Sequence, residues 1–177
     1  MEAYGCALSY GEAREIEDAL SSQGWDLHDS PEGVDLNVLV TCVVVQKTER
    51  AMLKRIRALA SSPKLVVTGC LATAGRERAE HIAPGAHFVA PGDIGSISSI
   101  AGVVGPRRDG PGTRLFEIVP MATGCVGECS YCITRLARGS IRSRSPERIV
   151  SQVERAVSSG PKEVQMTAQD TAAYGAD

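Results

Sequence analysis

The sequence predicts an α/β fold, with an open parallel sheet in the first hundred residues and a second α/β unit after it. Three observations support this prediction. Short apolar runs alternate with amphipathic stretches, a Gly-, Pro- and Arg-rich stretch interrupts the alternation at 102–113, and the alternation restarts at residue 114. A chain of 177 residues, 43% of them hydrophobic, can form one medium domain or one domain and part of another. We therefore expect a domain over 1–105, a linker over 106–113 and a second unit over 114–177.

The expected elements of the first domain follow the changes in hydrophobic periodicity. The stretch DLNVLVTC, 35–42, is nearly continuous in apolar character, as a strand buried on both faces of a parallel sheet should be. The helix over 46–60 places Ile56 and Leu59 on its apolar face, and the sequence SSP ends it. The expected order is strand 2–6, helix 10–22, strand 35–42, helix 46–60, strand 64–70, helix 75–82, strand 87–90 and helix 93–102.

The second unit is expected to contain two strands with one helix between them. The strands are 114–121 and 162–168, and the helix covers 145–160. Ser145 is a favourable N-cap and Pro146 occupies the first helical position. Two strands and one helix can neither close a barrel nor cover a sheet. We therefore expect a truncated second unit that is loosely held, with the apolar face of its helix partly exposed.

The composition favours an intracellular protein. No apolar run approaches the roughly 20 residues that a membrane helix needs, and the N-terminus lacks a charged region followed by an apolar one. We therefore expect a cytoplasmic protein with no membrane partner. Six cysteines in such a chain favour metal or redox chemistry over disulfides.

Three of the cysteines each end an expected parallel strand. These strand-end cysteines are Cys6, Cys42 and Cys70. The carboxyl ends of the strands in an open parallel sheet share one edge, where ligand sites form, so we expect the three sulfurs at one site. The alternative is that each is a free cysteine that packs as a small hydrophobic residue.

The other three cysteines lie close together in the sequence GCVGECSYC, 124–132. These loop cysteines are Cys125, Cys129 and Cys132. Structural zinc needs four protein ligands in most sites, and the three histidines of the chain lie far away in the sequence. Soft thiolates favour an iron–sulfur cluster. Three cysteines leave one iron of a [4Fe–4S] cube open, and an open position is typical of a catalytic site.

The spacing CxxxCxxC, with Tyr131 before its last cysteine, resembles the signature of radical S-adenosylmethionine (SAM) enzymes. The sequences YGCALSYGE, VTCVVV and TGCLA surround the strand-end cysteines. Together with the CxxxCxxC spacing, these three blocks make essentially the whole chain resemble the radical SAM methylthiotransferase family. The stretches CSYCITRLARGSIRSRSPERIV and KEVQMTAQDTAAYGAD look most like its archaeal and eukaryotic branch.

The resemblance implies the architecture and the cofactors. It implies a Rossmann-like N-terminal domain with an auxiliary [4Fe–4S] cluster on the strand-end cysteines. The first βαβ part of a radical SAM partial TIM-type barrel would follow, with a second [4Fe–4S] cluster on the loop cysteines. SAM would bind at the second cluster, beside Tyr131, and at the end of the last strand, beside Gln169 and Tyr174.

The resemblance also implies a reaction. One SAM would methylate sulfur held at the auxiliary cluster. A second SAM would yield the radical that abstracts hydrogen from C2 of N6-threonylcarbamoyladenosine next to the tRNA anticodon. The carbon radical would then take the methylthio group. The expected partners are tRNA, an electron donor and a sulfur source. Alternatives are methylthiolation of isopentenyladenosine in tRNA or of a ribosomal-protein aspartate, and, outside this class, a non-catalytic iron–sulfur or zinc-binding module. Because the rest of the barrel and an RNA-binding domain are missing, we expect these 177 residues to be inactive by themselves.

A basic stretch follows the loop cysteines. Over residues 135–148, five arginines against one glutamate give a net charge of +4. We expect Arg138, Arg142 and Arg144 to attract RNA phosphates, because the stretch lies where an anionic substrate would approach. The alternative is a solvated basic face.

Overall fold

The structure, a computed structural model, describes residues 1–107 and 114–177. Most of the expected linker, 106–113, therefore lies outside the described residues, and the expected domain boundaries remain a prediction.

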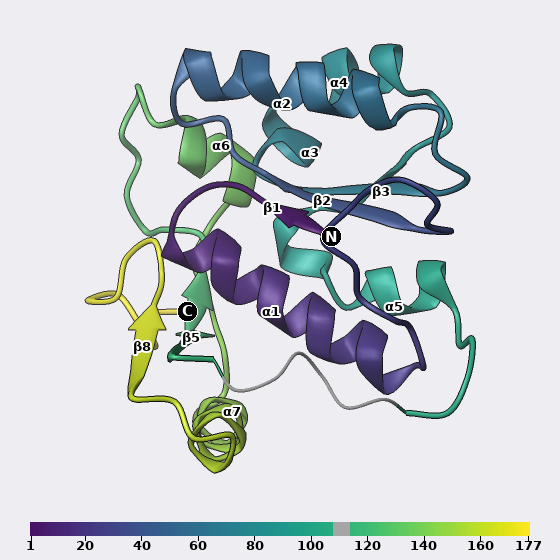
Figure 1. Cartoon of the computed structure of the whole chain (residues 1–177). Helices are drawn as coiled ribbons and strands as arrows, with labels where there is room; N and C mark the ends of the chain where they lie inside the picture. Colours follow the sequence, from purple (N-terminus) through teal and green to yellow (C-terminus); the bar gives the residue numbers. More distant parts are fainter. Residues whose placement is uncertain (108–113) are drawn as a thin grey trace.

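A parallel sheet forms the centre of the first part of the chain (Figure 1). Its order is β1-β2-β3-β4, and every neighbouring pair is parallel. All residues of the two central strands are buried, which explains their continuous apolar sequence. The predicted α/β class is confirmed. The strands are β1 (Glu2–Ala3), β2 (Asn37–Thr41), β3 (Leu65–Gly69) and β4 (His87–Phe88).

Helices cover both faces of this sheet (Figure 1). Side chains alternate along β2, so Val38 and Val40 face one hydrophobic cluster and Leu39 faces the other. The first cluster includes Ile16 of α1, and the second includes Ile56 of α2. The helices are α1 (Ala7–Ser22), α2 (Gln46–Leu59), α3 (Leu71–Ala74), α4 (Arg76–Ile82) and α5 (Ser96–Ala101), with a 3-10 turn, η1 (Pro91–Asp93).

The ends of several elements differ from the prediction. The first strand stops at Ala3, and the helix begins at Ala7 rather than at residue 10. Gly5, with φ of +137°, turns the chain between them. The short helix α3, directly after β3, was not expected.

The second unit contains the expected βαβ arrangement of β5 (Phe116–Pro120), α7 (Pro146–Ser158) and β8 (Glu163–Thr167). β5 and β8 pair in parallel. Two further features were not expected: the helix α6 (Ile133–Arg138), and an antiparallel pair of β6 (Ala122–Thr123) with β7 (Arg142–Ser143).

The second unit lies directly against α1, contrary to the expectation that it is loosely held. A Cβ added at Gly11 of α1 would lie 2.8 Å from Pro120 Cγ and 3.0 Å from Ile118 Cγ2, so the helix backbone almost touches β5. The helix α7 buries Ile149 but leaves Val157 60% exposed, so its apolar face is partly exposed as predicted.

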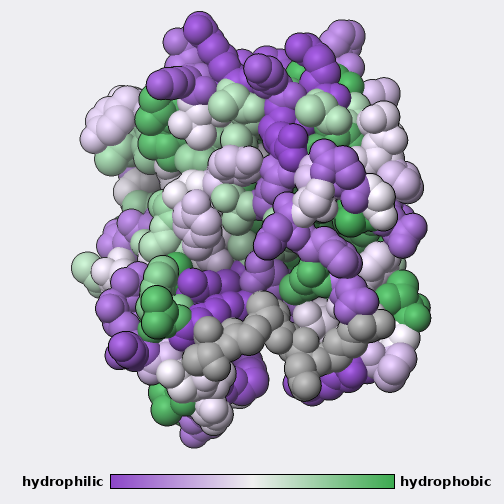
Figure 2. Space-filling model, viewed as in Figure 1, coloured by the Kyte–Doolittle hydropathy of each residue, from purple (hydrophilic) through white to green (hydrophobic). Residues whose placement is uncertain are grey.

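The visible surface is mostly hydrophilic, with hydrophobic residues in small separate groups (Figure 2). In the part of the chain that the structure describes, no helix is long and apolar enough to cross a membrane.

The N-cap of α7 gives a prediction of modest size. Ser145 Oγ accepts a hydrogen bond from the backbone N–H of Arg148, at 3.3 Å. Ser145→Ala should lower the free energy of unfolding by about 1 kcal/mol, because one helix N–H loses its partner. Urea denaturation measures this change. Ser158→Ala is the control at the other end of α7, since its hydroxyl only donates to the Glu154 carbonyl one turn earlier. Equal losses in both variants would contradict the cap.

Candidate iron–sulfur site

The strand-end cysteines lie at one edge of the sheet. Cys42 directly follows β2, Cys70 directly follows β3, and Cys6 precedes α1 just beyond β1. These three strands are parallel neighbours, so their carboxyl ends meet as predicted. Cys6 is exposed, whereas Cys42 and Cys70 are buried.

Glycines allow the backbone to come close at this edge. Gly69 has φ of +84°, and a Cβ there would lie 2.3 Å from the backbone oxygen of Thr41. That same oxygen accepts the N–H of Cys70 at 3.1 Å. At Gly5, a Cβ would lie 3.3 Å from Cys42 Cβ. These close approaches hold the start of the Cys70 segment against the end of β2 and bring the Gly5 backbone next to Cys42.

This close approach gives a second prediction. Gly69→Ala should destabilise the chain by more than about 1 kcal/mol, because alanine strains a left-handed backbone and its methyl group meets the Thr41 backbone. Gly85→Ala is the matched control, since no atom lies within 4 Å of its added Cβ. Thermal denaturation of both variants checks this. A Gly69 variant as stable as the Gly85 variant would contradict the prediction.

A buried arginine reaches this edge from the second unit. Arg138, the last residue of α6, has a side chain that is 0% exposed. Its guanidinium donates to both carboxylate oxygens of Glu12 on α1, at 2.5 and 2.9 Å. Its Nε donates to the sulfur of Cys70 at 3.4 Å, and Nη1 also donates to Thr123 Oγ1 at 3.4 Å.

Burial dominates the electrostatics of these groups. Burial raises the pKa of the Cys70 thiol, and the charge and hydrogen bond of Arg138 oppose that shift. Burial also raises the pKa of Glu12, again against the effect of Arg138. For Arg138, burial acts to lower the pKa, but the pairing with Glu12 outweighs it and the net shift is upward. We assign the ionised form to both partners, since the bidentate geometry suits a carboxylate and a guanidinium.

The loop cysteines form a second group after β6. The N–H of Gly127 donates to Cys125 Sγ at 3.2 Å. A Cβ added at Gly127 would lie 3.4 Å from the sulfur of Cys125 and 3.9 Å from that of Cys129. Cys132 lies just before α6, and its N–H donates to the Cys129 carbonyl at 3.0 Å. The loop therefore folds back around Gly127, which lies close to the sulfurs of Cys125 and Cys129.

The end of β8 meets this loop. Gln169 Oε1 accepts the N–H of Gly124 at 2.8 Å, so this predicted SAM-binding residue supports the loop backbone. Asp170, which the sequence reasoning missed, lies 3.8 Å from the sulfur of Cys125 through its Oδ2. The hydroxyl of Tyr174 donates to the Arg144 carbonyl at 2.8 Å. Tyr131 is 89% exposed, and the neighbouring Cys129 raises the pKa of its hydroxyl.

Two of the three predicted RNA-binding arginines are engaged within the protein, which corrects the sequence prediction. Arg138 is buried against Glu12 of α1, and Arg144 forms an ion pair with Glu15, which also lies on α1. The acidic residues of α1 thus neutralise these charges, and the fully buried Arg138 is not exposed to phosphate. Arg142 is exposed, with its guanidinium against the backbone of Gly92.

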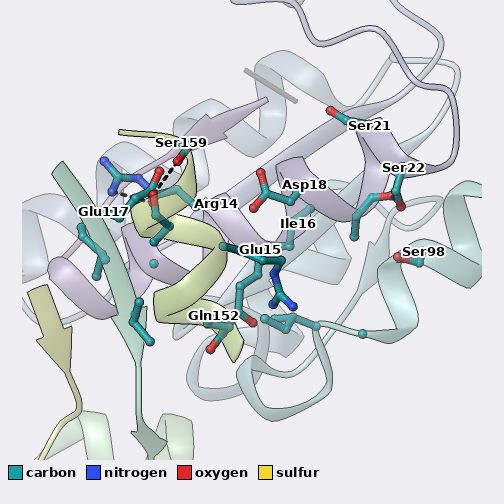
Figure 3. A pocket seen from close by; sticks show the side chains of 18 of the residues that line it. Arg14, Glu15, Ile16, Asp18, Ser21, Ser22, Ser98, Glu117, Gln152 and Ser159 are labelled. Atoms are coloured by element: carbon teal, nitrogen blue, oxygen red, sulfur yellow. Dashed lines mark hydrogen bonds and ion pairs between the residues drawn. The ribbon is translucent and has the colours of Figure 1, made fainter. Parts of the chain in front are cut away.

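A cleft of about 750 Å³ lies between α1, α5, β5 and α7. Figure 3 shows Arg14, Glu15 and Asp18 of α1 on its wall, with Gln152 of α7 and Ser159, directly after α7, nearby. Several of its charged groups pair with one another, as Arg14 does with Glu117 at 3.3 Å. None of its lining residues is a cysteine, so this cleft marks the junction of the two units rather than the cysteine site.

The donor chemistry of each cysteine set fits an iron–sulfur cluster. Each set offers three soft sulfur donors, and an N–H points at one sulfur in each. In residues 1–107 and 114–177, no three His, Cys, Asp or Glu side chains converge to hold a single metal ion. The thiolates of a cubane cluster bind different irons, so they stand further apart than the ligands of one ion.

The fold and site define a class: α/β proteins with cysteines on three adjacent strand ends and a second three-cysteine loop in a following βαβ unit. A family model described as "Uncharacterized protein family UPF0004" matches residues 1–90. The chain belongs to this family.

Relatives align over essentially the whole chain. A protein of Methanothermobacter thermautotrophicus named "Probable threonylcarbamoyladenosine tRNA methylthiotransferase" is 33% identical over 100% of this chain and 46% of its own length. A protein of the same name from Pyrococcus horikoshii is 32% identical over the same shares. "Ribosomal protein uS12 methylthiotransferase RimO" of Rhodopseudomonas palustris is 29% identical over 98% of this chain and 42% of its own length. The chain thus spans about half the length of these relatives, and its homologues are methylthiotransferases.

Proposed function

We propose that this chain forms part of a radical SAM methylthiotransferase that adds a methylthio group to C2 of N6-threonylcarbamoyladenosine in tRNA. The proposal includes an auxiliary [4Fe–4S] cluster on the strand-end cysteines, a second cluster on the loop cysteines, and SAM. It also includes tRNA, an electron donor and a sulfur source as partners, and a cytoplasmic location.

The observation that carries the proposal is the adjacency of the two cysteine sets. The helix α3 directly follows Cys70, and α6 directly follows Cys132. Leu71 of α3 and Ala137 of α6 belong to the same buried cluster, so the two helices pack together. A reaction that generates a radical at one site and transfers sulfur from the other needs such neighbouring sites.

The residues of the chain have defined tasks in this proposal. The backbone N–H of Gly127 donates to Cys125 and would stabilise a thiolate there. Gln169 holds the loop by accepting from Gly124. When bound, a reduced cluster on the loop cysteines would supply the electron that SAM cleavage requires.

The names of the relatives support the choice of substrate. The relatives at 32–33% identity are named for threonylcarbamoyladenosine in tRNA. A second candidate is an aspartate of a ribosomal protein, which the match to RimO at 29% identity favours.

Deletion of the gene that encodes this chain tests both substrates. We expect the methylthio form of threonylcarbamoyladenosine to disappear from the tRNA nucleosides in mass spectrometry. Methylthio-isopentenyladenosine and the mass of ribosomal protein uS12 should stay unchanged. Loss of the uS12 modification instead would favour the second candidate, and no change in any of the three would contradict the proposed function.

SAM binding separates an enzyme from an iron–sulfur module without catalysis. After anaerobic cluster reconstitution, addition of SAM should change the EPR spectrum of the reduced chain, because SAM would occupy the open iron. A reconstituted chain whose spectrum does not respond to SAM would favour a module that only transfers electrons.

A further inference from the structure

Arg138 is the one described side chain from the second unit that donates to a strand-end cysteine. It lies at the end of a six-residue helix that begins directly after Cys132. A single short element therefore connects a loop cysteine to Cys70. A helix of this length is about 9 Å long. Its first residue therefore lies next to the loop cysteines, and its last residue contacts a strand-end cysteine.

The orientation of the guanidinium is fixed from several sides. Both of its Nη atoms are held by Glu12, and Nη1 also reaches Thr123. The remaining Nε–H then points at the sulfur of Cys70. Because an arginine is planar, fixing one edge of the fork determines where the Nε–H points.

The charge on this donor matches a thiolate better than a thiol. A sulfhydryl is a weak hydrogen-bond acceptor, whereas hydrogen bonds between two charged groups are much stronger. Cys70 is buried, so water cannot supply this stabilisation in place of the arginine.

We propose that Arg138 is a positioning residue of the auxiliary site: its Nε–H fixes the Cys70 sulfur and raises the reduction potential of a cluster bound there. This inference rests on the proposed function, because it requires a cluster on the strand-end cysteines. Hydrogen bonds to cluster sulfurs are one of the main determinants of reduction potential. A donor at the sulfur stabilises the more negative, reduced state.

The test uses a background in which the loop cysteines are replaced by alanine, so that only the auxiliary cluster remains. In this background, Glu12→Leu with Arg138→Met removes the donor and both buried charges, leaving the net charge unchanged. Glu15→Leu with Arg144→Met is the matched control. It removes another ion pair between α1 and the second unit, and neither residue of that pair bonds to a cysteine among the described residues.

The midpoint potential is measured by redox titration followed by EPR. We expect the Glu12/Arg138 variant to shift to a more negative potential. A tenfold change in the reduction equilibrium would correspond to about 59 mV for one electron. The Glu15/Arg144 variant should keep the potential of the background chain. Arg138→Lys should shift it in the same direction, since lysine retains a cation opposite Glu12 but has no Nε–H fixed towards the sulfur.

Each result decides the inference. An unchanged potential in the Glu12/Arg138 variant, or an equal shift in the Glu15/Arg144 control, would overturn it. If the double variant does not fold, the Arg138→Lys potential decides instead. A background chain that binds no cluster would contradict the auxiliary site of the proposed function itself, and the inference would fall with it. A cluster with an unaltered potential would refute only the role of Arg138.

Discussion

Arg138→Met should destabilise the chain by about 3–5 kcal/mol, because it leaves the Glu12 carboxylate buried without its partner. Glu12 is only 2% exposed, so water cannot replace the lost hydrogen bonds. Urea denaturation followed by circular dichroism measures the change in the free energy of unfolding. Arg148→Met is the control on the same basic stretch, since the Arg148 side chain is 59% exposed and its ion pair with Glu15 is long, at 3.5 Å.

The double variant Glu12→Leu with Arg138→Met should recover most of that loss. Replacing both members of a buried ion pair by apolar residues of similar volume is often neutral or stabilising. The single and double variants together separate the cost of an unpaired charge from the value of the pair. A single variant as stable as the Arg148 control would show that the buried pair does not hold the second unit to α1.

Replacement of the loop cysteines by alanine should remove about half of the bound iron and leave the other cluster intact. The reconstituted chain should bind about eight irons, as two cubane clusters. The expectation follows from the placement of the two sets: the strand-end cysteines lie on the sheet and the loop cysteines lie beyond β6. Iron analysis and EPR of the anaerobically reconstituted variant measure the result.

The complementary variant, with the strand-end cysteines replaced by alanine, is the control. It should also lose about half of the iron but retain the EPR change on addition of SAM. Complete loss of iron from either variant would argue against two separate sites. Stoichiometric zinc without iron in the unmodified chain would favour a structural zinc-binding module.

The cysteine edge could be predicted because it depends on local pattern and on one general rule. The apolar runs ending at Cys42 and Cys70 indicate buried strands, and parallel strands bring their carboxyl ends to one edge. The helix α7 could be predicted for a similar reason, since its N-cap, proline and apolar spacing all lie within the helix or next to it.

Which arginines of the basic stretch are paired and which are exposed could not be predicted in this way. Its net charge of +4 is the same whether the arginines face solvent, RNA or another helix. The acidic partner of Arg138 is 126 residues away along the chain, and neither residue carries a local signal that marks it as buried. Only the packing of α1 against the second unit decides which arginines are neutralised.

The sequence by itself therefore determined the α/β class, the parallel sheet, the βαβ unit and the two sets of three cysteines, because these follow from short-range periodicity and spacing. The tertiary structure decided that Arg138 and Arg144 face α1, that Arg142 remains exposed, and that Arg138 reaches Cys70. The physical reason is that hydrophobic periodicity depends only on residues that are close together along the chain. The energy of a buried charge depends instead on a partner that only the folded chain brings within hydrogen-bonding distance.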